Sequence, residues 1–137
     1  MATLLLLAVV GIVLLVGWLR TDPGRNPPPP GYAEAACAAF GHLATGTDAL
    51  ADDDLATVTT EIGRADDSLT TLPAWEPGHA FEDLLASLLA TLLDATTAGP
   101  SDARLETAQN LVAVGSADIA QRRYGFDCGA ATPSPSS

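Results

Sequence analysis

The sequence FEDLLASLLATLLDA, residues 81–95, decides the fold class of this chain. It contains six leucines and no glycine or proline, and the leucines recur in pairs three or four residues apart. Pairs at this spacing form one broad apolar face on an α-helix. We therefore expect a helix from near Pro77, a residue that a first helical turn tolerates, to about Thr97. Because it is so apolar, we expect it to lie deepest of its neighbours in the fold.

The segment before it has a narrower apolar pattern. After three aspartates, Asp52–Asp54, which suit the N-terminal end of a helix, apolar residues follow in alternating steps of three and four until Pro73. This spacing predicts a helix with one stripe that packs against a partner. The stripe consists of Leu55, Val58, Ile62, Ala65, Leu69 and Leu72.

Two further helices are expected at the ends of this region. One runs from about Tyr32 toward Leu50 and packs through Ala36, Phe40, Leu43 and Thr47. The other is capped by Ser101, follows a stripe from Leu105 to Ile119 and stops at Gly125 in a left-handed conformation, so that RRYG forms its last turn. Runs of β-branched and aromatic residues, which are typical of strands, are missing after residue 20. The predicted fold class is all-α.

The N-terminal segment ATLLLLAVVGIVLLVGWL, residues 2–19, carries no charge. As a helix it would span about 27 Å, close to the thickness of a bilayer core. We expect a single transmembrane anchor over residues 1–20, with Trp18 and Arg20 at its polar boundary. A cleaved signal peptide is the alternative, although the basic start of such a peptide is missing and the candidate cleavage motif Ala33–Ala35 lies well beyond the apolar stretch.

The remaining segments complete the predicted organisation. Residues 21–31 contain four consecutive prolines, Pro27–Pro30, which favour an extended form and predict a stiff tether. The four prolines alone would span about 12 Å. Residues 32–128 form an acidic helical domain, and the Ser/Pro-rich residues 129–137 a disordered tail. We therefore expect an N-terminal single transmembrane helix followed by a small up-down four-helix bundle.

The chain has two cysteines, Cys37 and Cys128, one near each end of the predicted bundle. In an up-down bundle the start of the first helix and the end of the fourth lie at the same end. We therefore expect a disulfide between them, which closes a loop of about 90 residues and contributes on the order of 4.6 kcal/mol by the chain-entropy estimate. The alternative is two buried, unpaired thiols.

The orientation of the anchor depends on two opposing signals. Arg20 and Arg25 follow the apolar segment, and the positive-inside rule would then place the domain in the cytoplasm. A disulfide favours an oxidising compartment instead. We give the disulfide more weight and expect a single-pass protein of the cell membrane whose domain is extracytoplasmic.

Charge excludes one class of partner. Six arginines, with no lysine, stand against 17 acidic residues, and the net charge of -11 argues against nucleic acid, whose phosphates need cations. In the predicted bundle Arg122 and Arg123 fall at the membrane end, where they are candidate contacts to anionic headgroups or the usual cations of a helix C-terminus. The far end gathers Asp48, Asp52, Asp53, Asp54, Asp94, Asp102 and Glu106.

Catalytic and phosphate-binding motifs are missing from the sequence, so we expect no enzyme and no cofactor. The candidate metal ligands are two histidines and two carboxylates: His42, His79, Glu82 and Asp83. They do not form the Glu-x-x-His repeats of di-iron bundles. Trp75, in the loop LPAWEPGH, is expected to cap the core, and the alternative is an exposed contact residue for a partner or for lipid.

These observations favour a membrane-anchored domain with a binding or structural role at the cell envelope, with the lipid bilayer contacted through residues 2–19 and an unknown protein as partner. Two alternatives stay open at this point. One is a metal-handling or metal-dependent enzymatic bundle that uses His42, His79 and nearby carboxylates. The other is a cytoplasmic adaptor on an inverted anchor.

Overall fold

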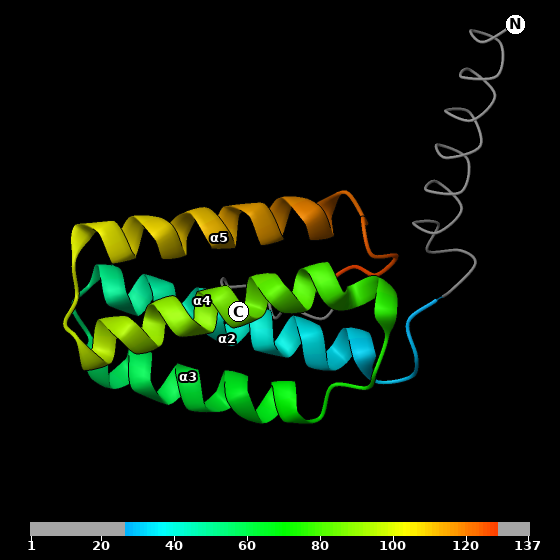
Figure 1. Cartoon of the computed structure of the whole chain (residues 1–137), viewed down its shortest axis with the longest axis horizontal. Coiled ribbons are helices and arrows are strands. Elements are labelled where there is room, and N and C mark those ends of the chain that lie inside the picture. The colour runs from blue at the N-terminus through cyan, green and yellow to red at the C-terminus, as the bar shows by residue number, and fades with distance from the viewer. Residues whose placement is uncertain (1–26, 129–137) are drawn as a thin grey trace, which may run out of the picture.

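The computed structural model of this chain describes residues 27–128 (Figure 1). The predicted anchor at residues 1–20, residues 21–26 of the predicted tether and the predicted tail at residues 129–137 lie outside this range. Within it the chain forms four α-helices and one short 3-10 helix, and no strand. The helices are α2 (Tyr32–Ala51), α3 (Leu55–Thr70), α4 (His79–Thr97), which follows the 3-10 helix η1 (Glu76–Gly78), and α5 (Asp102–Ala120). The all-α prediction is confirmed.

Consecutive helices run in opposite directions and pack as a bundle (Figure 1). Helices α2 and α4 lie in the middle of the view, with α5 on one side and α3 on the other. Helix α2 contacts each of the other three helices, whereas α3 and α5 do not touch. The two central helices, α2 and α4, therefore form the short diagonal of the bundle. The start of α2 lies at the same end of the bundle as the segment that follows α5 (Figure 1).

The deepest helix is α2, and our expectation that residues 77–97 lie deepest is wrong. Ten residues of α2 are buried, against five of α4. Many of the buried α2 positions are small, for example Ala36, Ala39 and Gly46, so three neighbours can approach the helix closely. Helix α4 instead leaves part of its leucine face outside, and Leu93 is 47% exposed.

The two predicted N-caps are confirmed. The Asp54 carboxylate accepts hydrogen bonds from the Thr57 hydroxyl (2.6 Å) and the Thr57 amide (3.2 Å) at the start of α3. These bonds favour the charged carboxylate and lower the pKa of Asp54. Ser101 Oγ accepts from the Arg104 amide (3.2 Å) in the same way at the start of α5.

The end of α5 differs from the prediction. The helix ends at Ala120, so Arg122 to Gly125 form a turn rather than a last helical turn. Gly125 does adopt the expected left-handed conformation (φ 79°), and Arg122 adopts one too (φ 53°). The two left-handed residues turn the chain back toward the start of α2, where Cys128 reaches Cys37. None of the helices in residues 27–128 is long and apolar enough to cross a membrane.

Candidate functional site

The disulfide fixes one end of the bundle. Cys37 in α2 is bonded to Cys128, 91 residues later, with the two Cα atoms 5.5 Å apart. Both side chains are nearly buried, with 6% and 5% of their surface exposed. The expected cysteine pair is therefore present in the structure. We call this end, which comprises the start of α2, the η1 segment and residues 121–128, the closed end.

Five aromatic rings pack against one another at the closed end, and we call them the aromatic cluster. They come from three separate parts of the chain and are Tyr32, Trp75, Phe81, Tyr124 and Phe126. Ring centroids lie 4.7 Å apart for Tyr32 and Trp75, 5.3 Å for Phe81 and Tyr124, and 5.9 Å for Phe81 and Phe126. Edge-to-face and tilted pairs at such distances add stability beyond the burial of area.

Gly78 lets the cluster close. A Cβ atom at this position would collide with the Tyr32 hydroxyl and lie 2.7 Å from Trp75 Cε3. The Tyr32 hydroxyl donates a hydrogen bond to Glu82 Oε2 at 3.0 Å. Burial of the ring, together with this neighbouring carboxylate, raises the pKa of Tyr32 well above its usual range. The phenol is therefore held protonated at the base of α4.

Trp75 is an internal residue of the closed end. Its side chain is 5% exposed and packs against Tyr32 and Phe126. This agrees with the capping role that we expected first. A role as a contact for a partner or for lipid stays a prediction, and it would require the loop that carries Trp75 to move.

Arg122 and Arg123 lie at the closed end, as expected, but each faces an acidic side chain. Arg122 is 3.7 Å from Asp127, and Arg123 is 3.4 Å from Asp118 and also lies over the Tyr124 ring. Both guanidinium groups are largely exposed, so such pairs contribute little to stability. Their contact with anionic headgroups stays a prediction, and it would compete with these two carboxylates.

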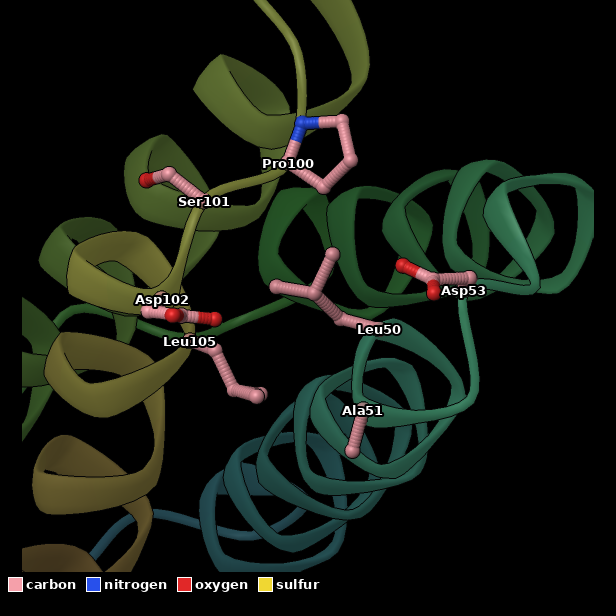
Figure 2. A pocket seen from close by; sticks show the side chains of 7 residues that line it. All are labelled: Leu50, Ala51, Asp53, Pro100, Ser101, Asp102 and Leu105. Atoms are coloured by element: carbon pink, nitrogen blue, oxygen red, sulfur yellow. The ribbon is translucent and has the colours of Figure 1, made fainter.

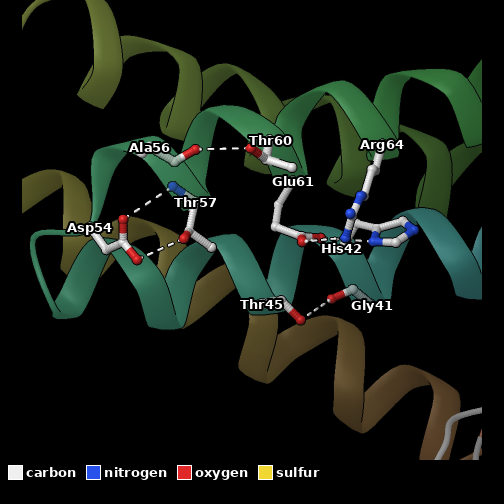
Figure 3. A network of polar contacts seen from close by, with 9 residues as sticks. All are labelled: Gly41, His42, Thr45, Asp54, Ala56, Thr57, Thr60, Glu61 and Arg64. Carbon is white, nitrogen blue, oxygen red and sulfur yellow. Dashed lines mark hydrogen bonds and ion pairs between the residues drawn. The ribbon is translucent and has the colours of Figure 1, made fainter.

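A buried carboxylate joins α2 to α3 halfway along the bundle (Figure 3). Glu61 is only 6% exposed, and its two oxygens point to different partners. His42 Nδ1 lies 2.8 Å from Glu61 Oε2, and Arg64 donates to Glu61 Oε1 at 3.1 Å. Two basic groups therefore compensate for the burial of one carboxylate, as burial of a charge requires.

The candidate metal ligands are not brought together. His42 is used by Glu61 and Glu82 by Tyr32, whereas His79 and Asp83 are exposed. Among residues 27–128, no three His, Cys, Asp or Glu side chains are grouped in a way that would hold a metal ion. The metal-handling alternative therefore has no ligand set in the described part of the chain.

The opposite end, which we call the acidic end, contains the turns between α2 and α3 and between α4 and α5. A shallow hollow of about 180 Å³ lies between these turns, lined by Leu50, Ala51, Asp53, Pro100, Ser101, Asp102 and Leu105. Figure 2 shows the two carboxylates, Asp53 and Asp102, on either side of the apolar Leu50 and Leu105 side chains. All seven acidic residues that we assigned to the far end lie at or near these two turns. Arg104 is also there and donates to the Gly99 carbonyl at 2.8 Å.

Sequence reasoning missed two features of these sites. Glu61 lies three residues after Val58, within the apolar stripe of α3, and that position was the available signal for a buried carboxylate. Tyr124 and Phe126 lie beyond the last helix, where periodicity gives no information on burial.

No protein-family model, curated protein or solved structure matches this chain.

Proposed function

We propose that this chain is a single-pass membrane protein that displays a disulfide-closed helical domain outside the cytoplasm, with a binding or structural role at the cell envelope. The observation that carries this proposal is the Cys37–Cys128 disulfide. Disulfides persist in oxidising compartments and are rare in the cytoplasm. The uncharged residues 2–19 supply the anchor in this account.

The positions of the two ends support the same arrangement. The described chain begins at Pro27, which leads into α2 at the closed end. With an anchor before residue 21, the closed end faces the bilayer and the acidic end points away from it. We therefore assign binding to the outward surface of the domain, where carboxylates predominate and a basic protein would be the complementary partner.

Binding is a better assignment than catalysis because the polar groups in the bundle have structural partners. The imidazole of His42 and the carboxylate of Glu61 bind each other across the interface of α2 and α3. Glu82 binds the Tyr32 hydroxyl in the aromatic cluster. These groups hold helices together, and this use accounts for them without a reaction.

Labelling of intact cells with a membrane-impermeant maleimide tests the location of the domain. The reporter is Ser116→Cys, an exposed position on α5, in a variant in which Cys37 and Cys128 are both replaced by serine. The same double variant without Ser116→Cys is the matched control. We expect the reporter to be labelled on intact cells. Labelling only after the cells are opened would overturn the proposal and favour the cytoplasmic adaptor, as Arg20 and Arg25 suggest.

A further inference from the structure

The segment Gln121–Cys128, which we call the strap, folds back over the rest of the closed end, where it contacts the start of α2 and Trp75. Backbone hydrogen bonds fasten its first half to the end of α5. The Arg122 amide donates to Ile119 O at 2.9 Å, and the Arg123 amide donates to Asp118 O at 3.0 Å. The second half is held by side chains: the Phe126 ring lies 6.0 Å from Tyr32, and Cys128 is bonded to Cys37.

The strap supplies two of the five rings in the aromatic cluster. Tyr124 and Phe126 are each 7% exposed, and both contact Phe81. Phe126 also lies 6.4 Å from Trp75. Removal of the strap would therefore uncover the other three rings, Tyr32, Trp75 and Phe81.

The centre of the bundle is built without the strap. The largest fully buried side chains there come from three helices: Leu43 in α2, Val58 in α3, and Leu85, Leu88 and Leu92 in α4. All five residues belong to helices and none to residues 121–128, so the helices themselves supply this apolar part of the core. Proteins open locally where a segment has few such contacts, while the rest stays folded.

From these observations we propose that the strap is a redox-released cover of the aromatic cluster. The Cys37–Cys128 bond keeps Tyr124 and Phe126 on the cluster. When a dithiol reduces this bond, the strap leaves and uncovers Tyr32, Trp75 and Phe81, while the four helices stay folded. The proposal uses residues 27–128 only, so it holds for either orientation of the anchor.

The chemistry is a two-step thiol–disulfide exchange. A thiolate of the dithiol attacks one sulfur of the Cys37–Cys128 bond, and the other sulfur leaves as a thiolate and takes up a proton. The second thiol of the dithiol, as a thiolate, then attacks the dithiol sulfur of the mixed disulfide, and the remaining protein sulfur leaves as a thiolate and takes up a proton. Two electrons and two protons thus pass to the protein, and the dithiol becomes a disulfide. Both cysteines are nearly buried, so attack on the intact bond requires a local opening around Cys128 that exposes a sulfur atom, and the strap leaves only after the bond is broken.

Limited trypsin digestion of the full-length chain in detergent tests the release of the strap. Trypsin cleaves after arginine here, because the chain has no lysine. Arg122 and Arg123 lie in the strap, and Arg64 lies within α3 as an internal reference for unfolding of the bundle. With dithiothreitol, we expect cleavage after Arg123 to accelerate by at least about tenfold while Arg64 stays uncut. An unchanged rate at Arg123, or cleavage at Arg64 at the same rate as at Arg123, would overturn the proposal.

A second measurement detects the strap without proteolysis. The rate of reduction by dithiothreitol should rise at least about fivefold in Phe126→Ala, because strap opening then no longer removes this ring from the cluster. Val114→Ala, a truncation at a residue that is 52% exposed on α5, is the matched control and should leave the rate unchanged. Equal rates in Phe126→Ala and the parent protein would show that Phe126 does not hold the strap and would contradict the proposal.

The cluster itself is followed through Trp75 in a Trp18→Phe variant, in which Trp75 is the one remaining tryptophan. Reduction should increase the quenching of its fluorescence by acrylamide, while the far-ultraviolet circular dichroism of the helices is retained. Unchanged quenching after complete reduction would mean that the cluster stays covered, and the proposal would fail.

Discussion

At the scale of single residues, Glu61 shows how a charge is accommodated inside the bundle. Its carboxylate is buried between α2 and α3 but is compensated by His42 and Arg64 (Figure 3). The side chain of Arg64 is 60% exposed, whereas that of His42 is 34% exposed and lies at the interface. The two partners should therefore differ in their contribution to stability, because solvent screens the exposed pair.

We expect His42→Ala to lower the free energy of unfolding by about 1–3 kcal/mol, since it leaves one oxygen of a buried carboxylate without its partner. Arg64→Ala should cost less than about 1 kcal/mol, because its pair is largely exposed. Urea unfolding of both variants measures the difference. Equal costs would show that the histidine is not the principal partner of Glu61.

Tyr32 predicts how stability depends on pH in the alkaline range. Burial and the Glu82 carboxylate raise the pKa of Tyr32 in the folded state, whereas an unfolded tyrosine titrates near pH 10. Above that pH the unfolded chain loses a proton that the folded chain keeps, so the stabilisation present below about pH 10 is lost as the pH rises toward the folded value. Burial also raises the pKa of Tyr124, which adds a smaller effect of the same sign.

Tyr32→Phe should therefore make the loss of stability above about pH 10 shallower than in the parent protein. Urea unfolding at a series of alkaline pH values measures the slope. Tyr32→Phe also removes the hydrogen bond to Glu82 and so lowers the free energy of unfolding at every pH. The comparison with the parent protein therefore uses the slope of this free energy against pH and not its absolute value. A slope identical to that of the parent protein would contradict the assigned role of Tyr32.

At the scale of helices, the sequence predicted the boundaries well where local chemistry determines them. Asp54 and Ser101 mark the starts of α3 and α5 because their side chains cap free amides. The end of α5 was missed because a tertiary constraint, the return of Cys128 to Cys37, turns the chain at Arg122. We did not predict that α2 is the most buried helix, because its small residues contribute little apolar area each. Small residues nevertheless let the neighbouring helices approach closely, and this buries α2.

Two glycines in helix interiors test the packing of the elements. A Cβ atom at Gly63 in α3 would have no atom within 4 Å apart from those of the adjacent residues and of the helix's own backbone, so Gly63→Ala should raise the free energy of unfolding by about 0.5–1 kcal/mol. At Gly115 in α5 the same atom would lie 2.5 Å from Phe40 Cε2 and 3.2 Å from Leu84 Cδ2. Gly115→Ala should therefore cost about 1–3 kcal/mol through overpacking.

The comparison of these two variants by thermal or urea unfolding separates helix propensity from packing. Both substitutions gain the same propensity, so only the space beside the helix differs. If both variants were stabilised, α5 would lie farther from α2 and α4 than the structure places it.

At the scale of the whole molecule, the two ends of the bundle have different chemistry. The closed end combines a disulfide with an aromatic cluster, and the acidic end combines carboxylates with a shallow hollow. The up-down order of the helices, which the sequence predicted, explains this separation because it places alternate turns at the same end. The aromatic strap was not predicted, because it depends on contacts between segments far apart in the chain, whereas the buried Glu61 had a signal in its place within the apolar stripe of α3.

The closed bundle and the strap both require that Cys37 and Cys128 are bonded in the protein as it exists in its host. Free thiols are alkylated at the moment of lysis, and the protein is then digested with trypsin without reduction. Because cleavage follows arginine, Cys37 lies in the peptide 26–64 and Cys128 in the peptide 124–137. We expect mass spectrometry to find these two peptides joined and reduction to separate them. Two separately alkylated peptides would contradict the closed bundle, and with it the extracytoplasmic location and the redox-released strap.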